Sequence, residues 1–188
     1  MTHPLNWNLI ESKYLISDIW LKLRADKCQL PNARTIEPYY VLEYPTWINV
    51  VAITSQNEVI LVRLYRHGIQ QTVLEIPSGG VEASDISVLA AARRELLEET
   101  GYGGGTFVET GQLSPNSANH ANTVHCFLAT GVEQISKPAE DEMEQLEIVR
   151  IPLLEVSNLV RNHGFFQALH VASLFFALDR LGKLNFQA

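Results

Sequence analysis

Residues 75–102, E-I-P-S-G-G-V-E-A-S-D-I-S-V-L-A-A-A-R-R-E-L-L-E-E-T-G-Y, decide the fold of this chain. An apolar strand is expected to end at Pro77, and Gly79 and Gly80 then open a loop. Beyond the loop the residues are strong helix formers, rich in alanine and leucine. The sequence therefore predicts a strand, a glycine loop and a helix in succession.

The predicted helix has expected ends and an expected buried face. Ser84 or Asp85 offers an N-cap, and Gly101 supplies a C-terminal stop. Apolar residues recur at helical spacing along one face. This face, which we expect to be buried, consists of Ile86, Leu89, Ala92 and Leu96.

Three carboxylates crowd the last turn of this helix. Glu95, Glu98 and Glu99 are three and four residues apart, so they project from one flank. Like charges at this spacing each cost a few tenths of a kcal/mol, and the helix dipole adds to the penalty. A hard cation such as Mg²⁺ reverses the argument, because it prefers carboxylate oxygens. The alternative is a solvated acidic face relieved by Arg93 and Arg94; the loop and helix around the cluster favour a metal site.

The segment R-E-L-L-E-E-T-G-Y at residues 94–102, with its glycine loop, resembles the signature box of the Nudix hydrolases. These enzymes cleave a nucleoside diphosphate linked to another group. The resemblance implies an α/β fold, an α/β/α sandwich with a central mixed sheet. It also implies that Glu95 and Glu99 bind Mg²⁺ or Mn²⁺, that Glu98 assists, and that the carbonyl of Ser78 is a further ligand.

One position departs from the family's box. A glutamate usually follows six residues after the box glycine, and that position is Ile86 counted from Gly80 or Asp85 counted from Gly79. The role of this acid is therefore open. Arg94 matches the arginine of the box, and the resemblance implies that it orients the carboxylates.

Length, charge and cysteine content limit the class of protein. A chain of 188 residues makes one domain, or one domain with a small appendage. A net charge of −7 argues against nucleic acid as a partner. Cys28 and Cys126 show neither disulfide nor zinc spacing. The start of the chain lacks a secretion-signal pattern, and the apolar helix expected at residues 165–181 is too short to span a membrane. We expect a soluble, cytoplasmic protein without a membrane partner.

Residues 1–44 are expected to form a small N-terminal antiparallel sheet that precedes the main domain, residues 45–188. Alternating residues around 21–26 and aromatic and branched residues at 36–44 are typical of strands. A sheet this small does not fold alone. From residue 11 to 181 the chain resembles the ADP-ribose pyrophosphatase branch of the Nudix family, which implies a homodimer with exchanged N-terminal strands.

Near-continuous apolar runs at residues 47–54, 58–68 and 72–77 predict strands buried on both faces. Arg63 and Arg66 are expected to point to opposite sides of their strand, because they are three residues apart. Arg66 matches the branch pattern V-R-x-Y-R-x-G, which implies that it binds the substrate phosphates. Arg63 is a further candidate for substrate binding. The alternative is a surface arginine paired with a glutamate.

Three more residues are candidates for substrate binding. Glu75 either supports the metal site from behind or pairs with an arginine. Trp47 has a ring that can stack on a nucleobase, as have Tyr39 and Tyr40, although such rings are more often core. Asn116, in the amide-rich loop 114–122, can hydrogen-bond a sugar hydroxyl, whereas the alternative is ordinary turn chemistry.

A second acidic cluster, P-A-E-D-E-M-E-Q-L-E, occupies residues 138–147. Most charge runs are solvated loops. The resemblance implies that one member of this cluster activates water and another reaches a metal. By position Glu142 is the expected base, and Glu144 is a metal ligand or an alternative base.

The resemblance implies Mg²⁺-dependent hydrolysis of the pyrophosphate bond of ADP-ribose or a related nucleoside diphosphate sugar. The products are a nucleoside monophosphate and a sugar phosphate. One alternative is a non-catalytic module that senses ADP-ribose, which the three retained box glutamates disfavour. Another is a Nudix enzyme that acts on a different nucleoside diphosphate derivative.

Overall fold

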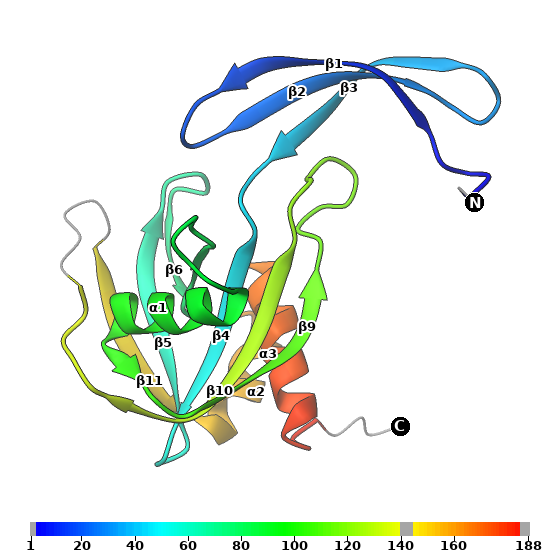
Figure 1. Ribbon diagram of the computed structural model, residues 1–188. Coiled ribbons are helices and arrows are strands. Elements are labelled where there is room, and N and C mark those ends of the chain that lie inside the picture. Colours follow the sequence, from blue (N-terminus) through cyan, green and yellow to red (C-terminus); the bar gives the residue numbers. More distant parts are fainter. Residues whose placement is uncertain (1–2, 140–144, 185–188) are drawn as a thin grey trace. The chain divides into compact units, whose positions relative to one another are not determined.

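The computed structural model describes residues 3–139 and 145–184 (Figure 1). The chain forms two compact units. The first contains the residues up to Pro45 together with Ser114–Thr123, and the second contains Thr46–Leu113 and the residues from Val124 onward.

The first unit is built on an antiparallel sheet in the order β1-β2-β3. Its strands are β1 (Asn8–Ser17), β2 (Lys22–Gln29) and β3 (Thr35–Glu43). The segment Ser114–Thr123 joins β3, because Leu42 donates to the carbonyl of Asn119 at 2.7 Å and its own carbonyl accepts from Ala121 at 3.0 Å. The expected small N-terminal antiparallel sheet is thus confirmed.

The second unit is built on an eight-stranded mixed sheet. Its central strands β4 (Trp47–Thr54) and β10 (Val124–Gln134) run parallel to each other, whereas the other pairings are antiparallel. The remaining strands are β5 (Glu58–Arg66), β6 (Gln71–Glu75), β7 (Ser78–Gly80), β8 (Tyr102–Gly103), β9 (Thr106–Leu113) and β11 (Leu146–Pro152). The apolar runs of β4 and β5 are buried as expected.

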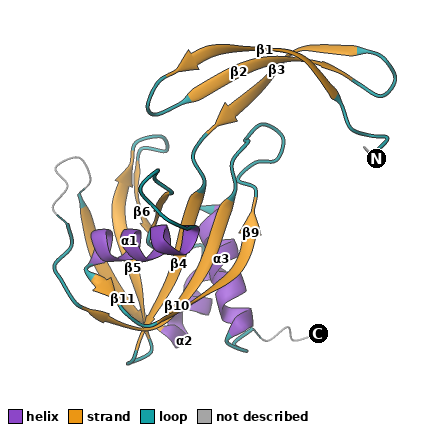
Figure 2. Cartoon of the chain, in the orientation of Figure 1, coloured by secondary structure: helices purple, strands orange, loops and turns teal. Residues whose placement is uncertain are grey.

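Helices cover both faces of this sheet (Figure 2). Helix α1 (Val88–Thr100) packs through Ala91, Ala92 and Leu96 on one face. Helices α2 (Leu153–Arg161) and α3 (Ala168–Arg180) pack on the other face, and residues such as Leu174 complete a second apolar core there. The predicted α/β/α sandwich is therefore confirmed. None of the helices within the described ranges is long and apolar enough to cross a membrane.

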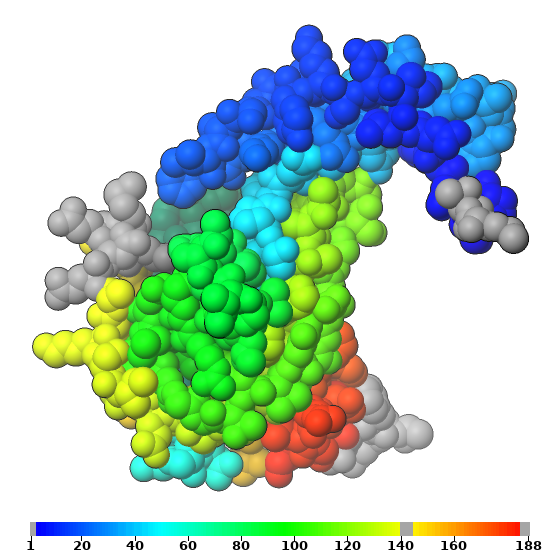
Figure 3. All heavy atoms as spheres, viewed as in Figure 1, coloured from blue at the N-terminus to red at the C-terminus, as the bar shows by residue number. Residues whose placement is uncertain are grey.

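The glycine segment before α1 differs from the expectation. Gly79 and Gly80 do not only open a loop, because together with Ser78 they form the short strand β7, which pairs with the start of β4. This pairing holds the segment beside the sheet. In the space-filling view the loop that follows and α1 (green) cover the near face of this unit (Figure 3).

The start of α1 also differs from the expectation. Its N-cap is Ser87, whose hydroxyl accepts from the amide of Ala90 at 3.1 Å, and not Ser84 or Asp85. Ile86 precedes the helix and is 95% exposed, and Leu89 is 37% exposed, so the predicted buried face is wrong at these two residues. The face that is buried consists of Ala91, Ala92, Leu96 and Thr100.

The end of α1 is tied to the chain beyond β10. Gly101 ends the helix with φ 72°, as predicted from its freedom to adopt this conformation. The carbonyl of Gly101 accepts from Ile135 at 2.9 Å and Ser136 at 3.1 Å, and the carbonyl of Glu98 accepts from Ala139 at 2.7 Å. Carbonyls that a helix end leaves without partners are thereby satisfied from a distant part of the sequence.

Candidate active site

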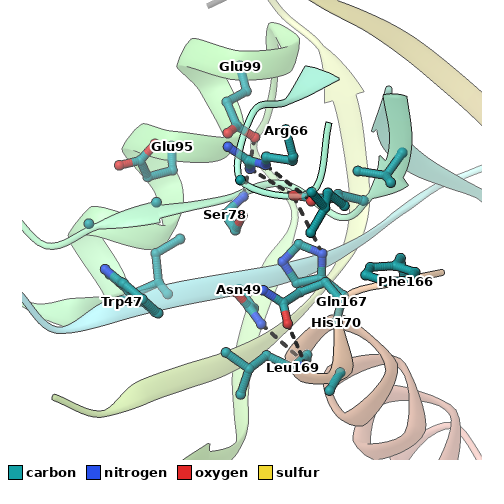
Figure 4. A pocket seen from close by; sticks show the side chains of 18 of the residues that line it. Trp47, Asn49, Arg66, Ser78, Glu95, Glu99, Phe166, Gln167, Leu169 and His170 are labelled. Carbon is teal, nitrogen blue, oxygen red and sulfur yellow. Dashed lines mark hydrogen bonds and ion pairs between the residues drawn. The ribbon is translucent and has the colours of Figure 1, made fainter. Parts of the chain in front are cut away.

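A pocket of about 820 Å³ lies in the second unit between β4, β6, β7, α1, the end of β5 and the start of α3 (Figure 4). Its volume is within the range of small-molecule sites. Six of the residues predicted for the site line it, namely Trp47, Arg66, Glu75, Ser78, Glu95 and Glu99. The fold therefore brings together residues from four separate parts of the sequence.

Glu95 and Glu99 enter the pocket from the last two turns of α1. The side chain of Glu95 is 14% exposed, and burial raises the pKa of its carboxyl group. Glu99 accepts a hydrogen bond from the amide of Ser78 at 3.2 Å, which ties α1 to β7. A Cβ at Gly79 would overlap the carboxylate of Glu95. A residue with a side chain here would therefore displace the carboxylate of Glu95 from its present position.

Arg94 binds several carboxylates around the glycine segment. Its guanidinium donates to both oxygens of Asp85, at 3.1 and 2.9 Å, and to the carbonyl of Gly80 at 2.9 Å. It also donates to Glu95 and to Glu98, at 2.9 Å each. These hydrogen bonds lower the pKa of Asp85 and raise that of Arg94. Asp85, and not Ile86, therefore provides the acid of the loop that the sequence left open.

Glu98 differs in position from the other two glutamates. Its side chain is 49% exposed and bound to Arg94, and it is not among the residues that line the pocket in the described part of the chain. Helical spacing placed all three carboxylates on one flank, but only Glu95 and Glu99 face the pocket.

Arg66 and Glu75 form a bidentate ion pair in the pocket wall. Nε and Nη2 of Arg66 donate to the two oxygens of Glu75 at 3.2 and 2.7 Å. Glu75 is 5% exposed, and its Oε2 lies 3.8 Å from Nδ1 of His170. Of the two roles considered for Glu75, the structure shows the pairing with an arginine. A fixed guanidinium at this place can bind phosphate oxygens.

Arg63 points away from this pocket. It pairs instead with Glu147 of β11 at 2.6 Å, and both side chains are well exposed. The opposite orientation of Arg63 and Arg66, expected from their spacing, explains the difference. Of the two arginines, Arg66 is the one that lines the pocket.

The other predicted site residues lie elsewhere. Asn116 belongs to the first unit, where its Oδ1 accepts from the amide of Ala118 at 3.2 Å, as in ordinary turn chemistry. Glu142 and Glu144 lie outside the described residues.

The pocket residues from the start of α3, and Asn49 of β4, were not predicted from the sequence. Phe166, Gln167 and His170 line it from the start of α3, and Asn49 lines it from β4. The amide nitrogen of Asn49 donates to Ser173 at 3.0 Å. The available signal was the set of polar residues that interrupt the apolar stretch 165–181, because a polar residue on a buried face requires a partner.

The donor set fits a hard divalent cation. No group of three His, Cys, Asp or Glu side chains in residues 3–139 and 145–184 forms a complete metal site. Mg²⁺ does not require such a group, because it takes one or two carboxylates and completes its shell with water and phosphate. Glu95 and Glu99 offer two carboxylates, and the buried one, Glu95, has a raised pKa that a nearby cation would reverse.

His170 should make the stability of the protein depend on pH. Burial lowers the pKa of His170 from 6.5 to about 4, with Glu75 opposing and Arg66 adding to the change. The unfolded chain therefore binds this proton first as the pH falls, and stability present above about pH 6.5 is lost towards pH 4. We expect a loss of about 3 kcal/mol from this residue.

Urea unfolding of the wild type and of His170→Asn at pH 7, 6, 5 and 4 measures this loss. The difference in unfolding free energy between the two should shrink or change sign as the pH falls, because the variant lacks the titrating group. A difference that is constant with pH would contradict the assignment.

Comparisons with known proteins agree with this geometry. The NUDIX domain family matches residues 44–169, and the family described as nucleoside diphosphate sugar hydrolase N-terminal domain matches residues 7–42. Both matches follow the order of the two sheets along the chain.

Curated relatives and a solved structure cover nearly the whole chain. The chain is 27% identical to the methanol dehydrogenase activator of Bacillus methanolicus, over 88% of this chain and 89% of that protein. It is 28% identical to the ADP-ribose pyrophosphatase of Bacillus subtilis, over 85% of each. A crystal structure of an ADP compounds hydrolase has the same fold, with a TM-score of 0.83, 23% identity and coverage of 98% of this chain and 100% of that one.

Proposed function

Because the chain belongs to the Nudix hydrolase family, we propose that it hydrolyses the pyrophosphate bond of ADP-ribose or a related nucleoside diphosphate sugar with Mg²⁺ or Mn²⁺. The observation that carries the proposal is the convergence of Glu95, Glu99 and Arg66 on one pocket. Two carboxylates can hold a cation there, and one guanidinium can bind phosphate. A relative named as an ADP-ribose pyrophosphatase supports the choice of substrate.

Different residues of the pocket would bind the cation, the phosphates and the nucleobase or sugar. Glu95 and Glu99, with the carbonyl of Ser78 and assistance from Glu98, would hold the cation, and Arg94 would fix the carboxylates. Arg66, which pairs with Glu75 in the protein without ligand, binds the phosphates, and the ring of Trp47 is available to the nucleobase or sugar. The cation supplies positive charge at the phosphates and acidity to a bound water.

The reaction adds water across the P–O–P anhydride linkage of the pyrophosphate. The water oxygen forms a bond to one phosphorus, and the bond from that phosphorus to the bridging oxygen breaks. We propose Glu142 as the base that takes the proton of the water, with Glu144 as a metal ligand or alternative base. The products are a nucleoside monophosphate and a sugar phosphate.

A survey of products tests the proposal. ADP-ribose, UDP-glucose, GDP-mannose and dinucleotides are incubated with the protein in Mg²⁺ or Mn²⁺, and the products are separated by chromatography. We expect AMP and ribose 5-phosphate from ADP-ribose. Absence of hydrolysis of every compound would reject the proposal.

Calorimetry with ADP-ribose distinguishes the non-catalytic alternative. A sensing module binds ADP-ribose but releases no phosphate when phosphatase is added, whereas the proposed enzyme releases phosphate continuously. Binding of ADP-ribose without phosphate release, together with no hydrolysis in the survey of products, would identify a sensor.

Arg66 and Arg63 form a matched pair for testing phosphate binding. Arg66→Ala should raise KM for ADP-ribose and lower kcat/KM by roughly 10²-fold, because a charge-assisted contact to phosphate is lost. Arg63→Ala should leave kcat/KM within about twofold, because exposed ion pairs contribute little. Equal effects of the two substitutions in a steady-state assay would contradict the assignment.

We propose that the protein is a homodimer joined through its N-terminal sheet. Strand β1 is exposed along its whole length and carries apolar residues such as Ile10 and Ile16, 53% and 43% exposed. An exposed apolar surface of this kind is typical of an interface. Exchange of these strands between two copies would cover it.

Light scattering after gel filtration measures this assembly. The wild type should have twice the chain mass of 21.1 kDa, and the double variant Ile10→Lys with Ile16→Lys should shift towards the single-chain mass. Leu154→Lys, which changes an exposed apolar residue of α2 in the second unit, serves as the control. A wild type of single-chain mass would exclude the dimer.

A further inference from the structure

His170 carries a buried polar atom that the proposed reaction does not explain. The residue is 4% exposed, and its Nδ1 finds no hydrogen-bond partner among residues 3–139 and 145–184. A buried polar atom without a partner is unfavourable by an amount similar to a lost hydrogen bond, so such atoms are rare in folded proteins. This one lies at the wall of the pocket, 3.8 Å from Oε2 of Glu75.

The surroundings of His170 favour one tautomer of its imidazole ring. Burial lowers its pKa to about 4, so the imidazole is neutral near pH 7 and carries one N–H. Nδ1 faces a carboxylate oxygen, and a lone pair there would be repelled by that negative charge. The proton therefore belongs on Nδ1, and the ring presents a donor to Glu75.

Glu75 already accepts two hydrogen bonds from Arg66, through both of its oxygens. If Arg66 turns towards a phosphate, at least one of these bonds lengthens. Water cannot replace the lost bond readily, because Glu75 is 5% exposed. A buried carboxylate oxygen without a hydrogen-bond donor is strongly disfavoured. The ion pair with Glu75 would therefore oppose the movement of Arg66 towards the substrate.

We propose that His170 is a positioning residue for Arg66, whose Nδ1–H closes onto Oε2 of Glu75 as the arginine turns to a phosphate of the substrate. Figure 4 shows His170 and Arg66 in the pocket. Oε2 of Glu75 lies 2.7 Å from Nη2 of Arg66 and 3.8 Å from Nδ1 of His170. A movement of about 1 Å brings the nitrogen from its present 3.8 Å to hydrogen-bond distance. The inference rests on the proposed function in one respect, namely that Arg66 binds phosphate.

Binding of a diphosphate that cannot be hydrolysed tests this role separately from catalysis. The probe is α,β-methylene ADP with Mg²⁺, and its dissociation constant is measured by calorimetry. His170→Leu should raise this constant about tenfold, the effect of losing one hydrogen bond to a buried charged group. His170→Asn should remain within about twofold of the wild type, because the amide of asparagine can place a donor near the position of Nδ1.

A double-mutant cycle shows whether His170 acts through Glu75. In a Glu75→Gln background, His170→Leu should have no further effect on the dissociation constant. A tenfold loss that persists in this background would overturn the proposal, as would equal losses in the Leu and Asn variants or no loss in the Leu variant. His125→Gln, a histidine of β10 that pairs with Glu109 outside the pocket, is the matched control and should bind as the wild type does.

The form of the ring can be observed directly. Long-range nitrogen–proton NMR spectra of the free wild type should show the proton of His170 on Nδ1, and a proton on Nε2 would overturn the proposal. Thermal unfolding confirms that each variant is folded. A protein that shows the expected binding pattern yet hydrolyses no nucleoside diphosphate sugar would refute the proposed function and support this role. A wild type that does not bind the probe would overturn this role, whereas the survey of products decides the proposed function.

Discussion

Glutamine in place of Glu99 is expected to lower kcat/KM for ADP-ribose by a factor on the order of 10²–10³ in excess Mg²⁺. The substitution preserves the size of the side chain and can keep the hydrogen bond from the amide of Ser78. It removes only the negative charge that Glu99 presents to the pocket. The loss therefore reports on this negative charge and not on the size of the side chain.

Glu98→Gln is the matched comparison on the same turn of α1. Glu98 is half-exposed, is bound to Arg94 and lies off the pocket wall, so its substitution should reduce kcat/KM by roughly tenfold or less. Initial rates at several Mg²⁺ concentrations provide both values. If Glu99→Gln retains full activity, or if Glu98→Gln is the more damaging change, the ligand assignment is wrong.

Replacing Arg94 with glutamine is expected to damage both stability and activity. Arg94 is 20% exposed and holds Asp85 and Glu95, whose side chains are 6% and 14% exposed. Its loss leaves these carboxylates without their main cation, which we expect to cost about 3 kcal/mol of unfolding free energy. The misplaced carboxylates should also lower kcat/KM by roughly 10–100-fold.

Arg93 provides the control for this substitution. It is the neighbouring residue on α1, but it is exposed and its guanidinium lies 4.6 Å from the ring centre of Phe107. Arg93→Gln should therefore change the unfolding free energy by about 1 kcal/mol or less and leave the rate nearly unchanged. Urea unfolding and the hydrolysis assay are run on both variants. Similar losses in the two would show that Arg94 acts only through the general charge of the helix.

The sequence predicted those parts of the fold that depend on local chemistry. The apolar run of β4, the end of α1 at Gly101 and the opposite directions of Arg63 and Arg66 each follow from residue spacing or backbone preference. The start of α1 was predicted wrongly. Asp85 does not cap the helix, because its carboxylate is bound by Arg94, which lies two turns into the helix. The strand β7 was not predicted, because two glycines carry no strand signal and the pairing with β4 is a tertiary contact.

The sequence predicted only those site residues that belong to a recognisable motif. Residue spacing placed Glu95, Glu98 and Glu99 on one flank, but the position of the sheet decides that Glu98 lies outside the pocket. His170 appeared in the sequence as an interruption of an apolar helix. Its role depends on Glu75, which lies far away in the sequence and becomes a neighbour only when α3 packs on the sheet against β4, β9 and β10.

The hydrogen bonds from Ile135, Ser136 and Ala139 to the end of α1 have a consequence for local motion. The last turn of an isolated helix frays, and its amide protons exchange quickly with solvent. Here the turn that carries the glutamates can open only if the chain leaving β10 detaches with it. The amides of both segments should therefore exchange with deuterium as one cooperative unit, at a rate set by the opening of the sheet.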